Sequence, residues 1–376
     1  MIKEKVKALW KLCFEDSEAF IEMYFRLRYN NEVNIAIESG DEVISALQML
    51  PYPMTFCGKQ IQTSYISGAC THPDYRGKGV MKELLSQALT KMLHNNVILS
   101  TLIPAEPWLF DYYAHMGYAP VFCYSENDIP DQDRSSTDVS VKRLTDEQEE
   151  VYQYLNQKMK ERPCCIQHTQ TDFKVILADL EISRGKMYIA IYEKKISGVA
   201  IVYQQENRLQ ISELFAENKE IEKALLYHIQ QDKKNGKVTL LTPPAANGKP
   251  FVLGMARIVD AKTFLQIYAA SYPNIEMNIE LTDKVLTTNN GYYYLCKGKC
   301  MFSKERLPGS HSQLTIGELC EKNSPPIEAL YEFNAQLKYA IQKHPVYPLR
   351  TRIRKTDIQD VVAFQRKNYI RLIRVR

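Results

Sequence analysis

The run HPDYRGKGVMKELL, residues 72–85, is the feature that most constrains what this chain can fold into. It follows a β-rich apolar stretch at 61–70 and opens an apolar helical pattern. Gly77 and Gly79 let the backbone turn sharply and approach a ligand closely, since neither residue has a Cβ. Apolar residues then repeat four apart along one helix face, namely Val80, Leu84, Ala88 and Met92. This order predicts a strand, a glycine loop and a helix packed on a sheet, as in α/β folds.

The predicted helix starts without the Ser, Thr, Asp or Asn that normally caps such a position. Its first-turn N–H groups have no acceptor inside the helix, so they are available to an anion. Arg76 and Lys78 add positive charge at the same place. The loop lacks the spacing of a P-loop and of a complete GxGxxG motif. We therefore predict that a bound phosphate of another kind of ligand supplies the missing cap.

Strand and helix patterns divide the 376 residues into three predicted segments. Residues 1–128 alternate strands and helices, and 139–250 repeats the order strand, strand, strand, helix without a glycine-rich loop. The third segment, 251–376, begins around MARIVDAKTFLQ. The polar stretch 125–138 is predicted to be a linker, and TPPAANGKP at 242–250 to be the next boundary. The predicted fold class is α/β (mixed α+β), and the length fits about two or three domains.

The expected elements follow from the same patterns of apolar residues. In the first segment we expect strands at 33–37, 42–50, 61–70 and 97–102, and helices at 18–27 and 108–115. In the second we expect strands at 186–193, 196–204 and 209–215, and helices from 145 and at 220–231. In the third we expect strands in MNIELTD and GYYYLCKGK and a helix at 316–321.

Composition narrows the class of protein. No apolar run reaches the roughly 18 residues needed to span a membrane. The N-terminus is charged throughout and lacks the apolar stretch of a secretion signal. Nine cysteines are scattered without a CxxC pair, which favours reduced thiols in a cytosol over a disulfide framework. We therefore expect a cytoplasmic protein with no membrane partner and no metal.

Positive charge is concentrated at the C-terminus. Between residues 348 and 376 nine basic side chains stand against two acidic ones, whereas the net charge of the whole chain is +4. A basic tail raises the hypothesis of nucleic-acid binding. Apolar residues interleave these charges as in a partly buried strand, namely Ile370, Leu372, Ile373 and Val375. A solvated arm would not need them, so we expect no nucleic-acid partner.

The order of strand, HPDYRGKG, apolar helix, strand and FDYYAHMGY resembles the GNAT acetyltransferases. Their pyrophosphate loop has Gln or Arg, two further residues, Gly, one residue, and Gly or Ala, which matches 76–81 except that Met81 replaces the last small residue. A bulky residue there is seen in the branch related to the enhanced-intracellular-survival (Eis) acetyltransferases. Residues 99–118, with their YxxxGY signature, are similar to that branch too.

The resemblance extends over nearly the whole chain. The second segment is similar to a further GNAT domain that is degenerate at its loop, and the third resembles sterol carrier protein. The expected architecture is therefore an N-terminal GNAT domain at 1–128, a degenerate GNAT-like domain at 139–250, and a sterol-carrier-like α+β domain at 251–376. The resemblance is specific in 66–118 and only architectural elsewhere.

The resemblance implies acetyl-CoA as co-substrate, bound between two splayed strands and without a metal. Backbone groups of Ala69, Cys70 and Thr71 would hold the pantetheine arm. The pyrophosphate would lie on the loop formed by Arg76, Gly77, Lys78, Gly79, Val80 and Met81. Cys70 is expected to be a small buried residue and not a nucleophile, because the thioester already presents the acyl group.

Two catalytic roles are implied in the same way. Tyr113, four residues before Gly117, stands at the family's position for the acid, and a phenol can protonate a thiolate. The alternative role of Tyr113 is that of a structural tyrosine in the hydrophobic core. The strand before the loop, SYISGACTHP, has no carboxylate to act as base. In the Eis branch the terminal carboxylate reaches the site, here that of Arg376, and Glu106 is the competing candidate.

The sequence thus predicts an N-acetyltransferase that works through a direct ternary complex with an amine. A catalytically inactive module that binds CoA or a lipid is the alternative. The acceptor is an amine-bearing small molecule or a peptide lysine. Arg371, Arg374 and Arg376 near the expected site argue against a polycation. Homo-oligomer formation is left open.

Overall fold

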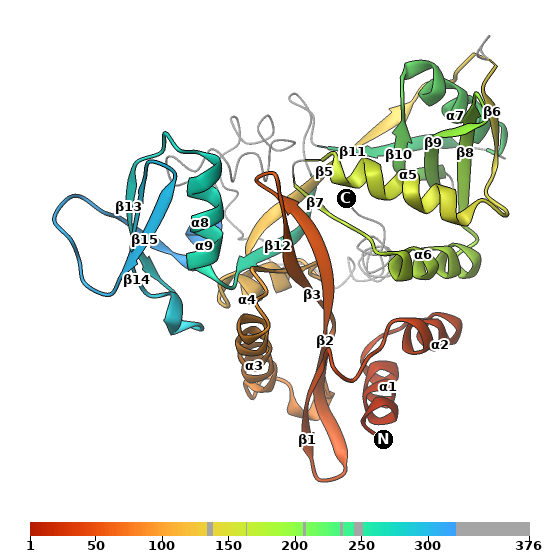
Figure 1. Ribbon diagram of the computed structural model, residues 1–376. Helices are drawn as coiled ribbons and strands as arrows, with labels where there is room; N and C mark the ends of the chain where they lie inside the picture. The colour runs from red at the N-terminus through yellow and green to blue at the C-terminus, as the bar shows by residue number, and fades with distance from the viewer. Residues whose placement is uncertain (134–137, 163, 206–207, 234–235, 244–250, 321–376) are drawn as a thin grey trace.

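The computed structural model describes residues 1–133, 138–162, 164–205, 208–233, 236–243 and 251–320 (Figure 1). The helices in these ranges are α1 (Ile2–Cys13), α2 (Glu18–Leu27), α3 (Val80–His94), α4 (Trp108–Ala114), α5 (Gln148–Lys160), α6 (Gln170–Ile182), α7 (Lys219–Gln231), α8 (Ala261–Ser271) and α9 (Ile316–Cys320). Two 3₁₀ turns are η1 (Pro73–Tyr75) and η2 (Thr287–Asn289).

The strands of the large sheet are β1 (Asn34–Ser39), β2 (Glu42–Phe56), β3 (Lys59–Thr71), β4 (Leu99–Leu102), β5 (Ala119–Ile129), β6 (Ser140–Arg143), β7 (Cys165–Ile166), β8 (Lys186–Tyr192), β9 (Lys195–Gln205), β10 (Arg208–Ala216), β11 (Lys237–Thr242) and β12 (Phe251–Ile258). Their order is β1-β2-β3-β4-β12-β5-β11-β10-β9-β8-β6, and β7 pairs with β2. A separate sheet has β13 (Met277–Thr282), β14 (Gly291–Cys296), β15 (Lys299–Ser303) and β16 (Ser312–Thr315). This is the mixed α/β class that the sequence predicts.

The first half of the large sheet consists of β1, β2, β3, β4, β12 and the part of β5 up to Tyr124. Helices cover both faces of this half. Figure 1 shows α3 on one side of β2 and β3, and α1 and α2 on the other. The apolar face of α3 is fully buried, as its spacing predicts, at Leu84, Leu85, Ala88 and Leu89. The helix predicted at 18–27 is α2 with the same bounds, and Ser17 caps it by accepting from the N–H of Phe20. The sequence patterns did not predict the helices α1 and α6. Among the strands of the large sheet, they did not predict β5, β6, β7, β11 or β12.

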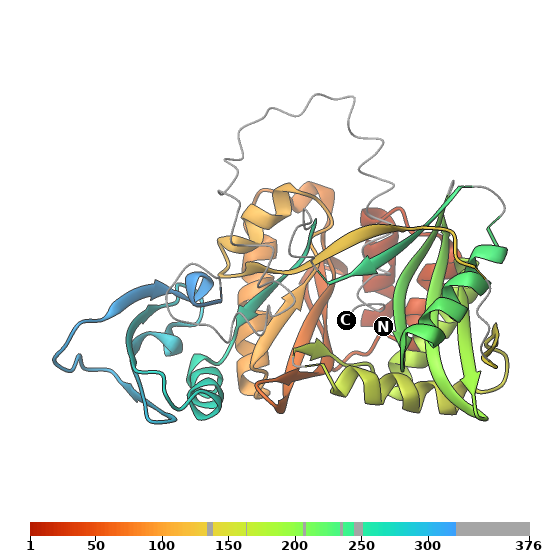
Figure 2. The ribbon, with the colours of Figure 1, turned by 90° about the horizontal axis from the view of Figure 1, so that it is seen from above.

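The predicted linker at 125–138 is wrong in its first part, because β5 continues to Ile129. The strand pairs with β12 up to Tyr124 and with β11 from Ser125 onward, so it joins the two halves of the large sheet (Figure 2). Its polar residues have cross-strand partners: Asp128 pairs with Lys237 at 2.6 Å, and Asn127 donates to Thr242 at 2.7 Å. Because its residues are polar, this part of β5 has the composition of a loop, which explains why the sequence patterns predict a linker.

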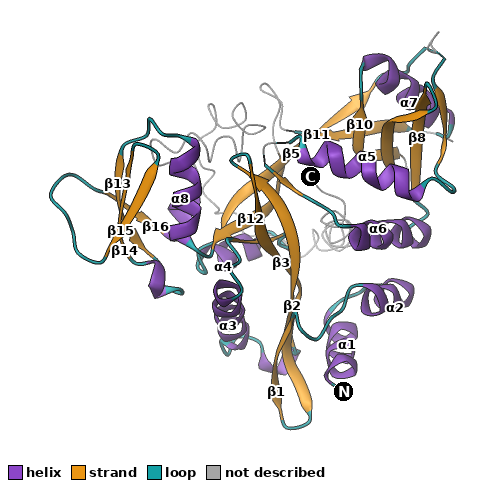
Figure 3. Cartoon of the chain, viewed as in Figure 1, coloured by secondary structure: helices purple, strands orange, loops and turns teal. Residues whose placement is uncertain are grey.

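The segment MARIVDAKTFLQ forms the end of β12 and the start of α8. Strand β12 lies between β4 and β5 and pairs antiparallel with both, so residues from beyond 250 complete the sheet of the first segment. Helix α8 then packs on β14 and β15 of the smaller sheet (Figure 3). The domain boundaries remain predictions. No helix in the described part of the chain is long and apolar enough to cross a membrane.

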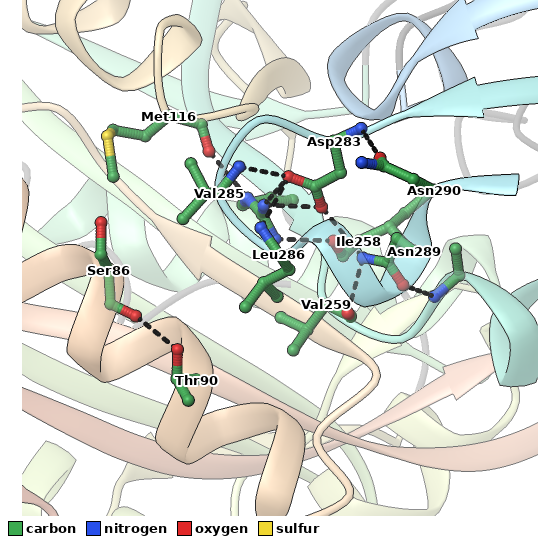
Figure 4. A network of polar contacts seen from close by, with 12 residues as sticks. Ser86, Thr90, Met116, Ile258, Val259, Asp283, Val285, Leu286, Asn289 and Asn290 are labelled. Carbon is green, nitrogen blue, oxygen red and sulfur yellow. Dashed lines mark hydrogen bonds and ion pairs between the residues drawn. The ribbon is translucent and has the colours of Figure 1, made fainter.

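A buried arginine on β12, Arg257, connects three parts of the chain. Figure 4 labels its partners Met116, Ile258 and Asp283. The Nη2 atom of Arg257 donates to both carboxylate oxygens of Asp283, at 2.7 and 2.9 Å, and both side chains are fully buried. Its Nε donates to the carbonyl of Met116 at 2.7 Å, in the turn after α4. Asp283 also accepts from the N–H groups of Val285 and Leu286. The charge is therefore compensated on several sides, as a buried ion requires.

We expect Asp283→Ala to lower the free energy of unfolding by about 3–5 kcal/mol, because it leaves the buried Arg257 without its counter-charge. Urea unfolding measures the change. The exposed neighbour provides the control, since Lys284→Ala should stay within about 0.5 kcal/mol of the wild type. A loss below about 1 kcal/mol for Asp283→Ala would contradict the assigned role of the pair.

Candidate active site

Strands β3 and β4 run parallel but pair over a short stretch only. The paired residues are Thr63 to Tyr65 on β3 and Leu99 to Thr101 on β4. Strand β3 continues to Thr71, paired on its other edge with β2. In the described part of the chain, the edge of β3 that faces β4 therefore has no ladder partner on β4 over residues 66–71. The resemblance to the GNAT acetyltransferases implies two splayed strands, and a ladder that ends at Tyr65 agrees with that expectation.

A bulge in β3 precedes the three residues expected to contact pantetheine. Ala46 pairs with Cys70 and Gln48 with Ser67, so two residues of β3 stand opposite one of β2. Gly68 lies in the bulge with φ +60°, and a Cβ there would be 2.1 Å from the ring of Trp10. The buried indole of α1 thus occupies the space that glycine leaves, and fixes where β3 bends.

The glycine loop has the geometry that its sequence predicts. Gly77 and Gly79 have φ values of +72° and +80°, a region in which other residues are strained. Apart from its chain neighbours, no atom of the described residues would lie within 4 Å of a Cβ on either glycine, so the described part of the chain leaves this side of the loop open. Gly79 caps α3 without any side-chain hydrogen bond, and the first helical bond runs from the N–H of Glu83 to Gly79. The N–H groups of the first turn remain directed at this open space.

Two cations stand beside the loop. The exposed Arg76 donates from Nε to the carbonyl of Thr71 at 3.1 Å, which connects the loop to the end of β3. The ammonium of Lys78 lies 5.3 Å from the centre of the Tyr75 ring. The side chain of Met81 is partly buried against the core of the first half, which explains how a bulky residue fits at this position. The loop therefore combines uncapped N–H groups with positive charge.

Tyr113 on α4 is 7% exposed and lies among other tyrosines. Its ring centre is 5.5 Å from that of Tyr112 and 5.7 Å from that of Tyr118. Burial, with smaller contributions from these two phenols, raises the pKa of Tyr113 above its usual range. The phenol therefore keeps its proton at neutral pH, as an acid must. Its catalytic role stays a prediction.

Close packing explains why the YxxxGY signature has a glycine at position 117. Gly117 has φ +84°, and a Cβ there would lie 2.6 Å from Ile316 and 3.1 Å from Nε of Arg257. Arg257 also holds the carbonyl of Met116. The turn after α4, the helix of Tyr113, therefore packs against both α9 and β12.

The other predicted site residues are placed as follows. Cys70 is buried and its carbonyl accepts from the hydroxyl of Ser45 at 3.0 Å. Glu106 is half-buried just before α4, and its carbonyl accepts from Leu109. Arg376 lies outside the described residues, so the base remains a choice between two hypotheses.

Sequence reasoning missed a buried polar cluster between the two halves of the large sheet. Arg28 pairs with Asp172 of α6 at 2.6 Å, and its guanidinium lies 4.8 Å from the ring centre of Tyr52. His168 meets the same ring edge-to-face, and burial lowers its pKa, so it is neutral at pH 7. Burial raises the pKa of Tyr65, with smaller contributions from the phenols of Tyr52 and Tyr113. Only the tertiary fold reveals the polar cluster, because its members come from separate elements.

Comparison with known proteins agrees with this geometry. The family model described as an acetyltransferase (GNAT) domain matches residues 3–121. Among solved structures, a protein from Enterococcus faecalis V583 described as a probable N-acyltransferase has a TM-score of 0.70 at 18% identity, covering 84% of this chain and 86% of its own. A GCN5-related N-acetyltransferase from Kribbella flavida has a TM-score of 0.67 at 19% identity, covering 84% of each chain. Eis1 from Mycobacterium abscessus has 0.62 at 11%, covering 85% of this chain and 86% of its own.

No curated protein matches the chain. Residues 3–121 match the model of the GNAT acetyltransferase domain, and this match supports the assignment of the protein as an acyltransferase. The solved structures show that the fold of most of the chain, beyond the matched domain, is shared with proteins described as N-acetyltransferases and with Eis1.

We expect Gly68→Ala to destabilise the protein more than Gly40→Ala. The two glycines have nearly equal φ values, +60° and +59°, but an added Cβ meets the Trp10 ring only at Gly68 and open space at Gly40. The left-handed backbone alone costs about 1–2 kcal/mol, and overpacking adds about 1–3 kcal/mol. Urea unfolding of both variants isolates the second contribution. Equal losses would show that Trp10 does not hold the bulge.

Proposed function

We propose that this protein is an acetyl-CoA-dependent N-acetyltransferase that transfers the acetyl group directly to an amine in a ternary complex. The observation that carries the proposal is the uncapped start of α3 beside the edge of β3, which beyond Tyr65 has no ladder partner on β4 among the described residues. Coenzyme A carries one group for the helix start and one for the strand edge. Its pyrophosphate is an anion for the helix N-terminus, and the amides of its pantetheine arm pair with a strand edge.

Each predicted binding residue has a role in this proposal. The backbones of Ala69, Cys70 and Thr71 bind pantetheine along the edge of β3. The N–H groups of loop 76–81 and the charges of Arg76 and Lys78 bind the pyrophosphate. The three-domain organisation of the Eis type, with a sterol-carrier-like part at 251–376, is proposed with it.

The chemistry needs a neutral amine, an acid and a base. The amine attacks the thioester carbonyl, and the C–S bond then breaks. Tyr113 gives its proton to the departing thiolate, and its raised pKa keeps that proton on the phenol at neutral pH until it is transferred. The proton lost by the amine goes to the terminal carboxylate of Arg376 or to Glu106. The acceptor is an amine-bearing small molecule or a peptide lysine.

Titration calorimetry tests the binding half of the proposal. Arg76→Ala should weaken acetyl-CoA binding by about 10- to 100-fold, because it removes a charged partner of the pyrophosphate. Arg26→Ala, at an exposed arginine of α2, is the matched control and should leave the affinity unchanged. An equal loss of affinity for a pantetheine thioester without the pyrophosphate would contradict the assignment.

Thiol release from acetyl-CoA across a panel of amines then tests turnover. Binding without turnover on any amine would favour a CoA-binding module that has lost its chemistry.

We expect Tyr113→Phe to keep the affinity for acetyl-CoA and to lower kcat by about 100-fold, the usual scale of general acid catalysis. Tyr112→Phe removes a neighbouring, half-buried phenol and should affect kcat much less. Because the acid is the protonated form and its pKa is raised, kcat should not fall on this account between pH 7 and about 10. Equal values of kcat for the wild type and Tyr113→Phe, with chemistry rate-limiting, would contradict the role.

A further inference from the structure

Two cysteines meet where the end of α1 packs on β3. The thiol of Cys13, the last residue of α1, donates to the carbonyl of Thr71 at 3.5 Å. Cys70, the residue before Thr71, is buried in the apolar cluster against which Cys13 packs, and both cysteines are free. We infer that Cys13 and Cys70 form a redox-active dithiol, which exchanges with low-molecular-weight disulfides to give an intramolecular disulfide.

The packing of α1 holds the two thiols in register. Trp10, which is three residues before Cys13, fills the space over Gly68, which is two residues before Cys70. Residues three apart on a helix lie on the same face about 5–6 Å apart, so Cys13 follows Trp10 on the face of α1 that packs on β3. Gly68 and Cys70 both face α1, since the Trp10 ring lies over Gly68 and Cys70 is buried in the cluster that contains Trp10.

The surroundings give the two thiols different reactivity. Cys13 is half-buried, and its pKa is lowered by the neighbouring thiol of Cys70 and by the charge of Arg76. These two effects outweigh the burial of the Cys13 thiol, which by itself raises its pKa. Cys70 is buried, and its pKa is raised by Cys13 and by burial. Since the thiolate is the nucleophile, Cys13 attacks first and Cys70 resolves.

The exchange balances without any other reactant. The Cys13 thiolate attacks one sulfur of a disulfide such as oxidised glutathione, forms a mixed disulfide and releases one glutathione thiolate. The sulfur of Cys70 then attacks the Cys13 sulfur and displaces the second glutathione. Two protein thiols are oxidised, one glutathione disulfide is reduced to two thiols, and the protons of Cys13 and Cys70 end on glutathione.

The pair also stands beside the edge of β3. Oxidation removes the thiol that donates to the carbonyl of Thr71, which Arg76 also contacts. If pantetheine binds there, a part that rests on the proposed function, the disulfide should weaken acetyl-CoA binding by about three- to tenfold. Dithiothreitol should restore the affinity.

The test incubates the folded wild-type protein with oxidised glutathione, followed by alkylation, trypsin and mass spectrometry. We expect one cross-linked peptide pair, residues 12–26 with residues 60–76, two hydrogens lighter than the sum of the reduced peptides. Absence of this pair in the wild type would overturn the inference. Glutathione found on Cys70 with Cys13 unmodified would overturn it as well.

Two variants separate the roles. In Cys70→Ser the mixed disulfide cannot be resolved, so Cys13 should retain glutathione. Cys296→Ser, at an exposed cysteine outside the pair, should give the same yield of cross-link as the wild type. Acetyl-CoA titration of the cross-linked protein is read separately. An unchanged affinity would overturn the coupling to the cofactor site but not the dithiol.

Discussion

The rest of the structure depends on one buried charge, the guanidinium of Arg257. A guanidinium carries five N–H donors and cannot lose its proton, so each donor needs a partner once it leaves water. Asp283, Met116 and Ile258 supply these partners from the loop after β13, the turn after α4 and β12 itself. Three segments that are far apart in sequence must therefore come together before the charge can be buried.

The position of β12 and Arg257 also determines the geometry around the candidate active site. Strand β12 enters the first half of the sheet between β4 and β5, so residues from beyond 250 set the spacing of the strands beside the candidate site. The turn that Arg257 holds ends the helix of Tyr113. A GNAT domain match that stops at residue 121 thus covers the loop and the proposed acid, but not the strand and the arginine that support them.

The sequence predicted those parts whose signals are local. The uncapped start of α3, the two glycines and the bounds of α2 each follow from neighbouring residues, and the structure confirms them. The ending of β5 at Ile129 and the place of β12 could not be predicted, because polar strands with cross-strand partners look like loops and strand order is not local. The Arg28 and Asp172 pair joins residues 144 positions apart, so no pattern along the chain marks it.

The arrangement at the end of β3 shows how the stability of the fold and the chemistry of the site share the same atoms. Trp10 can enter the bulge only because Gly68 has no side chain, and the same bulge directs the backbone of Cys70 and Thr71. The carbonyl of Thr71 accepts from both Arg76 and Cys13, one from the loop and one from α1. The carbonyl of Thr71 therefore connects α1 to the glycine loop. This connection links the packing of the first helix to the groups proposed to bind the cofactor.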